Sequence, residues 1–165
     1  PAGPAIFAQA AQMAAQHQAR IALSLSDQWC VDRHRADLRH YVTDHVDILF
    51  ANEDEAISLV ETDHTTSVQM LSGLVDEVVI TRGPLGAVIC HAGRQLLVDA
   101  KPQGPVIDTT GAGDLFAAGY LFGRTHGYDA QMSGQIASLL AGEVISHIGA
   151  RPHADLQVLI KPFIG

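Results

Sequence analysis

The chain has 165 residues, of which 47% are apolar and 17% are charged, so it can bury a core and carries too little charge to remain disordered. This length predicts one globular domain. Lys and Arg number 10 and Asp and Glu number 18, which gives a formal charge of −8. Nucleic-acid and anionic-membrane binders usually carry the opposite sign, so neither is expected as a partner.

The chain opens with no basic and apolar leader, and its apolar runs are shorter than the roughly 20 residues of a membrane span. Its two cysteines, Cys30 and Cys90, form no recognisable motif. These features predict a cytoplasmic protein. Residue 1 is Pro rather than Met and lies next to a predicted helix, which we interpret as a sign that the chain is part of a longer protein.

Helical and buried-strand patterns alternate in the first half of the chain. The helices are predicted at residues 5–18, 31–42, 52–60 and 65–74, and the strands at residues 20–25, 46–50 and 77–81. This alternation predicts an α/β fold with a doubly wound, mostly parallel sheet and helices on both faces.

The pattern changes after Thr81, where residues 82–86 have turn chemistry. Two short strands at residues 87–90 and 95–98 predict a hairpin at the edge of the sheet. A third short strand is predicted at residues 106–107, followed by helices at residues 113–126, 130–148 and 154–160.

The most informative run is residues 106–119, where a predicted strand meets a Gly-containing loop that opens a helix. Gly111 and Gly113 allow close approach of a ligand, and free N–H groups at the helix start attract an anion such as phosphate. Asp114 places a carboxylate beside this site, where a phosphate-transfer enzyme needs a proton acceptor.

Two named phosphate motifs do not fit this run. A P-loop requires Lys where Asp114 stands, and a dinucleotide fingerprint requires Gly where Phe116 stands. The structural alternative remains open: a Gly-rich turn in which Asp114 is an ordinary helix cap or first-turn acid.

Other candidate residues also have two interpretations. Asn52 and Glu55 are spaced as a capping box, which is the structural alternative to a ligand site. Thr81 and Gly83 also fit the entry to a hairpin, and Ala137, Ala141 and Val144 fit a core-facing helix stripe. The nine histidines form no zinc-binding spacing, so no zinc site is predicted.

Residues 108–114, Asp-Thr-Thr-Gly-Ala-Gly-Asp, resemble the C-terminal signature of the ribokinase-like (PfkB) family of carbohydrate and nucleoside kinases. Residues 52–56 resemble its Asn-x-x-Glu element, residues 81–87 its Thr-x-Gly-x-x-Gly segment, and residues 148–150 the turn after its penultimate helix. The sequence of residues 144–152 is most similar to that of the bacterial adenosine-kinase-like branch.

The resemblance covers residues 1–165 and implies the C-terminal, nucleotide-binding and catalytic part of such a kinase, without the N-terminal strands and the lid. It implies transfer of the γ-phosphoryl of ATP to a hydroxymethyl group of a nucleoside such as adenosine. A sugar of the ribose or hexose type is the alternative acceptor, and a nucleotide-binding fragment without turnover is a further alternative. The full-length parent is expected to be active, with a homodimer as one possible assembly, and the fragment alone inactive.

The resemblance also implies a role for each matching residue. Asp114 is the expected base, and the N–H groups of Gly111, Ala112 and Gly113 form the expected anion hole. Asn52 and Glu55 position Mg²⁺ through its waters, and Asp108 and Thr110 belong to a monovalent-cation site for which K⁺ is the candidate. The expected ATP-binding residues are Asn52, Glu55, Thr81, Gly83, Gly86, Thr110, Ala137, Ala141, Val144 and Gly149.

Overall fold

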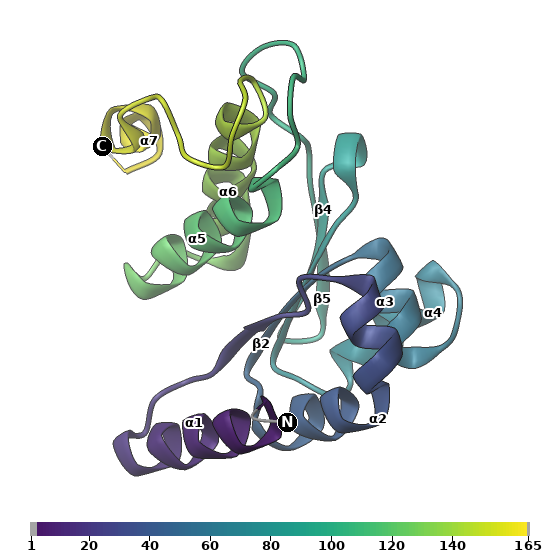
Figure 1. The fold of residues 1–165 in the computed structure, drawn as a ribbon. Coiled ribbons are helices and arrows are strands. Elements are labelled where there is room, and N and C mark those ends of the chain that lie inside the picture. The colour runs from purple at the N-terminus through teal and green to yellow at the C-terminus, as the bar shows by residue number, and fades with distance from the viewer. Residues whose placement is uncertain (1–2, 165) are drawn as a thin grey trace. The chain divides into compact units, whose positions relative to one another are not determined.

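The computed structural model describes residues 3–164 (Figure 1). In chain order the elements are α1 (Gly3–His17), β1 (Ala22–Ser24), α2 (Gln28–His45), β2 (Ile48–Asn52), α3 (Glu53–Val60), α4 (His64–Ser72), β3 (Glu77–Thr81), a 3-10 turn (Gly83–Leu85), β4 (Ala87–His91), β5 (Arg94–Val98), α5 (Ala112–Thr125), α6 (Ala130–Val144) and α7 (Leu156–Ile164). No helix within residues 3–164 combines the length and the apolar character that crossing a membrane requires.

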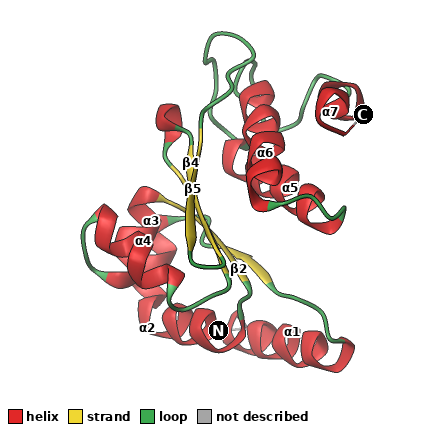
Figure 2. Ribbon diagram, turned by 180° about the vertical axis from the view of Figure 1, so that it is seen from behind, coloured by secondary structure: helices red, strands yellow, loops and turns green. Residues whose placement is uncertain are grey.

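The strands form one five-stranded sheet in the order β1-β2-β3-β4-β5. β1 and β2 are parallel, with Leu23 opposite Leu49. β4 and β5 are joined by Ala92 and Gly93, whose φ angles of 50° and 71° are both positive, as a type I′ hairpin turn requires. The sheet is therefore mixed, and Figure 2 shows β4 and β5 as neighbouring strands.

By its internal contacts the chain divides into two compact units, Pro1–Ile80 with Cys90–Arg94 and Thr81–Ile89 with Gln95–Gly165. In the first unit, β2 and β3 are almost continuous runs of buried apolar residues, as expected for strands covered on both faces. Helices α2, α3 and α4 pack on one another in succession, and α3 also packs on β2 (Figure 1).

The second unit is built on the pair α5 and α6, with α7 packed against α6. The apolar cluster between these helices contains Ile136, Leu139, Leu140 and Ile160 as its buried members. Residues 126–129 join α5 to α6, so the two helices run antiparallel and the beginning of α5 lies beside the end of α6.

The α/β class, the edge hairpin and the order of helices agree with the sequence prediction, but three details are wrong. Residues 106–107 form no strand, because the Ile107 N–H donates to the carbonyl oxygen of Ile145 (2.8 Å) rather than to a neighbouring strand. The helix predicted to reach residue 148 ends at Val144. β1 was expected to be buried, but Ala22 and Ser24 are exposed on this first strand of the sheet order.

Two glycines of α5 allow its close contact with α6. A Cβ atom at Gly119 would lie 2.7 Å from Cα of Ala137, and one at Gly123 would lie 2.8 Å from Cα of Ser133. Both distances are shorter than the usual separation of non-bonded carbon atoms. The atoms in the way belong to the α6 backbone, which cannot rotate away as a side chain can. The helix pair therefore depends on the absence of side chains at these positions.

We expect Gly119→Ala to destabilise the protein by about 1–3 kcal/mol, since overpacking against α6 outweighs the better helix propensity of Ala. The control is Gly104→Ala, where the added Cβ would meet only the Ser146 side chain at 3.6 Å. Urea unfolding of both variants measures the difference. A Gly119→Ala protein as stable as the control would contradict the close packing of α5 on α6.

Candidate functional site

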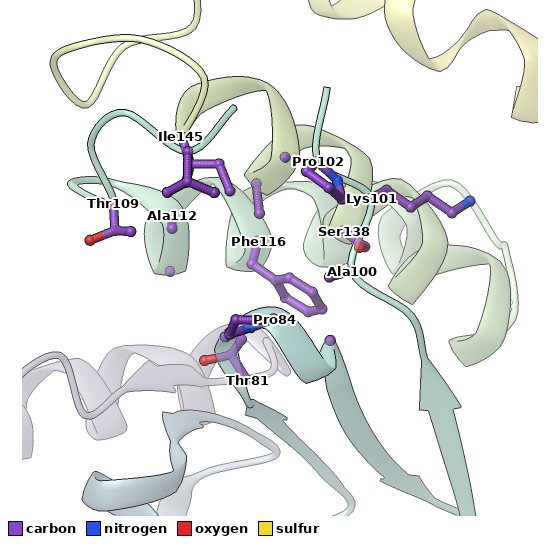
Figure 3. Close-up of a pocket in the computed structure, with 16 residues that line it drawn as sticks. Thr81, Pro84, Ala100, Lys101, Pro102, Thr109, Ala112, Phe116, Ser138 and Ile145 are labelled. Carbon is purple, nitrogen blue, oxygen red and sulfur yellow. The ribbon is translucent and has the colours of Figure 1, made fainter. Parts of the chain in front are cut away.

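A cavity of about 480 Å³ lies in the second unit (Figure 3). This volume is within the usual range of small-molecule sites. The lining residues come from the turn after β3, the segment after β5, the start of α5 and one face of α6. They are Thr81, Gly83, Pro84, Gly86, Ala100, Lys101, Pro102, Val106, Thr109, Ala112, Gly113, Phe116, Ser138, Ala141, Gly142 and Ile145.

The cavity is mostly apolar, and the one charged residue on its wall directs its charge elsewhere. Phe116 projects its ring towards Thr81 and Pro84, whereas the Lys101 side chain extends away from these residues (Figure 3). The Lys101 ammonium lies 4.5 Å from the ring centre of Phe163 in α7. Such a wall suits a flat, largely apolar group better than a strongly charged one.

Glycine is required where the turn after β3 meets the segment after β5. Gly86 has a φ angle of +80°, and a Cβ there would overlap the carbonyl oxygen of Val98 and lie 2.8 Å from the backbone nitrogen of Ala100. This contact brings residues 83–86 and residues 100–102 to the same cavity. The Thr-x-Gly-x-x-Gly segment is thus shaped by close backbone approach.

The start of α5 has the geometry of an anion site. Gly111 is the N-cap residue, in the left-handed conformation with a φ angle of +83°, and its lack of a side chain leaves the helix without a side-chain cap. The Ala112 N–H donates to Thr109 O (3.2 Å). Within residues 3–164, the N–H groups of Gly111 and Gly113 have no acceptor. These donors, at the positive end of a 14-residue helix, can bind a negative group.

Asp114 lies in the first turn of this helix, where its side chain is exposed. The N-cap is Gly111 and not Asp114, so the interpretation of Asp114 as a helix cap is wrong. Two interpretations of Asp114 remain: a first-turn acid that the helix dipole stabilises, or a reactive carboxylate next to the free N–H groups.

The Asp108 carboxylate closes the turn that precedes α5. Its Oδ1 accepts the Thr110 N–H and its Oδ2 accepts the Gly149 N–H, both at 2.9 Å. The Gly149 N–H, with the hydroxyl and the N–H of Thr110, lowers the pKa of Asp108 to about 2. Asp108 is therefore ionised at neutral pH and joins the motif to the segment after α6.

The structure brings some predicted site residues to the cavity and leaves others outside it. Those on the wall are Thr81, Gly83, Gly86, Ala112, Gly113 and Ala141, and those not on it are Gly111, Asp114, Asp108, Thr110, Ala137, Val144 and Gly149. From α6 and its C-cap, the residues on the cavity wall are Ser138, Ala141, Gly142 and Ile145, so only Ala141 of the predicted stripe is on the wall. Ala137 and Val144 are fully buried instead.

Asn52 and Glu55 belong to the first unit and form a complete capping box at the start of α3. Asn52 Oδ1 accepts the Glu55 N–H (2.8 Å), while the Glu55 oxygens accept the backbone and side-chain N–H groups of Asn52 (both 2.9 Å). Burial raises the pKa of Glu55, and nearby Asp27 and Asp54 add to this, against the Asn52 hydrogen bond. The capping interpretation is confirmed, and a role in binding magnesium stays a prediction.

Among the described residues, no three His, Cys, Asp or Glu side chains are grouped as ligands for a metal ion. A cation such as Mg²⁺, which keeps several of its waters and uses substrate phosphates as ligands, needs no such group. The residues at hand fit this second mode, since the Glu55 carboxylate keeps lone pairs beyond its two hydrogen bonds.

Sequence reasoning missed several residues of the cavity wall, among them Ala100, Lys101 and Pro102. They follow β5 in a segment with neither periodicity nor a motif. A signal was available on α6, where Gly142 interrupts a helical run: a Cβ there would overlap the Lys101 carbonyl oxygen. A glycine inside a helix is often a sign of such close approach.

Comparison with known proteins identifies the family of this chain. Residues 1–156 match the model of the pfkB family carbohydrate kinases. A probable sugar kinase from Rhizobium etli is 37% identical, with a TM-score of 0.91 over 94% of this chain and 48% of its own. An adenosine kinase from Sinorhizobium meliloti is 36% identical, with a TM-score of 0.91 over 95% of this chain and 49% of its own.

A nucleoside kinase from Methanocaldococcus jannaschii is 30% identical over 113 residues, which make up 67% of this chain and 36% of that protein. The chain thus spans about half the length of the two solved relatives, and less of the nucleoside kinase. Because the family model covers nearly the whole chain, the chain belongs to the pfkB family of carbohydrate kinases.

Proposed function

We propose that this chain is the nucleotide-binding and catalytic part of a kinase that transfers the γ-phosphoryl group of ATP to a hydroxymethyl group. The observation that carries the proposal is the composition of the cavity wall. The wall of an apolar cavity suited to a base and a sugar includes Ala112 and Gly113, in the first turn of α5. A nucleotide bound there directs its phosphates to the N–H groups of that turn.

In this mechanism the chain supplies a proton acceptor and an anion hole. The Asp114 carboxylate takes the proton of the acceptor hydroxyl while the hydroxyl oxygen forms a bond to the γ-phosphorus. The bond between the γ-phosphorus and the β,γ-bridging oxygen breaks at the same time, and ADP leaves. The N–H groups of Gly111 and Gly113 donate to the oxygens of the transferred group, with Ala112 adding its share if the turn loosens its bond to Thr109. ATP supplies the phosphoryl group, and Mg²⁺, when bound, would neutralise part of the charge of the ATP phosphates.

The acceptor is proposed to be a nucleoside of the adenosine type. The adenosine kinase and the nucleoside kinase among the relatives support this choice. The probable sugar kinase matches with the same TM-score as the adenosine kinase, which keeps a ribose-type or hexose-type sugar as the second candidate. Because the chain spans about half of these proteins, a nucleotide-binding fragment without turnover is the third.

Asp114→Asn should lower kcat at least 100-fold, since general-base catalysis contributes about 10²–10⁴. The affinity for Mg·ADP should stay within about tenfold, because the backbone donors remain. The measurements are coupled phosphotransfer to adenosine and ribose, with any flanking sequence of the gene present, and calorimetry with Mg·ADP.

The control is Asp129→Asn, the same change at the N-cap of α6, where Asn caps equally well. It should leave both quantities unchanged. Full turnover in Asp114→Asn would refute the base, and Mg·ADP binding without any wild-type turnover would favour the fragment.

Glu55→Gln tests the magnesium role apart from the capping role. Gln at this position maintains a capping box, so stability should change by less than about 1 kcal/mol. Loss of the charge should raise the Mg²⁺ concentration for half-maximal velocity several-fold. Asp54→Asn removes an exposed acid from the same helical turn and is the matched control. Equal Mg²⁺ dependence in the two variants would leave Glu55 as a cap alone.

We also propose that Asp108 and Thr110 belong to a monovalent-cation site, with K⁺ as the candidate. The hydrogen bonds from Gly149 and Thr110 support this role, because they keep the Asp108 carboxylate charged. Each carboxylate oxygen still has a lone pair available for a cation.

The Asp108 carboxylate should titrate near pH 2, below its ordinary value of 3.8. Because the folded-state pKa is the lower one, its contribution to stability is complete above pH 3.8 and is lost as the pH falls through about 2. Carbon-13 NMR of the Asp carboxyl groups measures the midpoint. Thr110→Val should move the midpoint upwards but not to its ordinary value, and a wild-type midpoint near 3.8 would contradict the assignment.

A further inference from the structure

Glu143 occupies a position that a carboxylate normally avoids. It lies in the last turn of α6, where the helix dipole is negative, and it is only 5% exposed. A buried carboxylate at the negative end of a helix is unfavourable unless donors compensate its charge. The contacts of this side chain therefore indicate what it is for.

Within residues 3–164, the three groups that donate to Glu143 come from the segment after α6 and bind one oxygen. Oε1 accepts the N–H groups of His153 (2.9 Å) and Ala154 (2.8 Å) and faces Nε2 of His147 at 3.3 Å. Oε2 is buried and has no partner among the described residues. Burial raises the pKa of Glu143, but the donors outweigh it and the pKa lies below its ordinary value. The side chain is thus an ionised anchor.

The anchored segment is residues 146–154, which we call the return loop. Its two histidines, His147 and His153, stack with ring centres 3.6 Å apart and planes at 11°. The stack and the Glu143 carboxylate together hold both ends of the return loop at the end of α6. Between these ends the loop carries Gly149 and Ala150.

The middle of the return loop contacts the motif that leads into α5. The Gly149 N–H donates to Asp108 Oδ2 (2.9 Å). Ala150 packs so closely on Gly111 that a Cβ there would lie 2.8 Å from the Ala150 Cβ. Both ends of the segment 108–111 are therefore in contact with the return loop, Asp108 with Gly149 and Gly111 with Ala150.

We infer that Glu143 is a positioning residue for the anion-binding turn at the start of α5, acting through the return loop. It touches no substrate; it fixes Gly149 and Ala150, and these fix Asp108 and Gly111. An anion hole is effective only when its donors are in place before the charge develops, so this support matters for the reaction. The inference rests on the proposed function for its catalytic part and on the contacts alone for its structural part.

The structural part is tested by hydrogen exchange of single amides in Glu143→Gln. Gln keeps the shape but loses the charge, and with its amide oxygen at the place of Oε1 it puts an NH₂ group at the buried place of Oε2, which has no partner among the described residues. The amides of Thr110 and Gly149, which both donate to Asp108, should exchange at least tenfold faster. Amides of β3 should not change.

Two further variants keep this test decisive. Glu77→Gln alters another fully buried carboxylate, one that pairs with Arg20 in the first unit, and should leave the Thr110 and Gly149 amides unchanged. His147→Asn removes one donor and leaves the backbone donors of Glu143, so it should give a smaller increase and serves if Glu143→Gln does not fold. Unchanged exchange at Thr110 and Gly149 in a folded variant would overturn the inference.

The catalytic part is tested by the division of the effect between kcat and KM. Glu143→Gln should lower kcat at least tenfold while the KM for ATP changes less than threefold, whereas Glu77→Gln should leave kcat within twofold at a comparable loss of melting temperature. Faster exchange with an unchanged kcat would overturn the positioning role. Faster exchange in a protein whose wild type, assayed with its flanking sequence present, transfers no phosphoryl group would refute the proposed function and leave the support of the loop by Glu143 in place.

Discussion

The close approach of α5 and α6 is the constraint on which the second unit depends. The absence of side chains at Gly119 and Gly123 lets the two backbones meet. Because the helices are antiparallel, this contact also places the positive end of α5 beside the negative end of α6. The cavity lies at this junction, with Gly113 from one helix and Gly142 from the other on its wall. The packing of α5 on α6 therefore also determines where the cavity lies.

A second constraint acts on residues 106–111, the turn that leads into α5. This turn has neither a strand nor a side-chain cap to hold it, since residues 106–107 are irregular and Gly111 cannot cap. Besides its own bond from the Thr110 N–H to Asp108, it is held from outside: the Ile145 carbonyl accepts the Ile107 N–H, and the Gly149 N–H donates to Asp108. A turn without regular structure of its own can expose its N–H donors, provided that a neighbouring segment holds it.

Local patterns predicted much of this structure from sequence. The limits of β3, the position of α5 and the start of α6 are predictable, because buried apolar runs and helix-start residues are local signals. Residues 106–107 were mistaken for a strand because two apolar residues beside a glycine loop look alike in either state. The end of α6 is predicted too far along the chain, and the segment that follows it is held by bonds to Glu143 from residues ten and eleven positions further on. Propensity carries no information about such contacts.

The direction of the Lys101 side chain has a consequence for ionic strength. The chain carries a formal charge of −8, and this cationic residue of the cavity wall turns its ammonium onto the Phe163 ring. In the proposed function, phosphates at the start of α5 would be attracted chiefly by fixed backbone dipoles, which act at contact distance. Salt screens interactions over about 10 Å at 0.1 M and affects contacts far less. Within the proposed function, the main effect of salt on nucleotide affinity is therefore to screen the long-range repulsion between the phosphates and the net charge of −8.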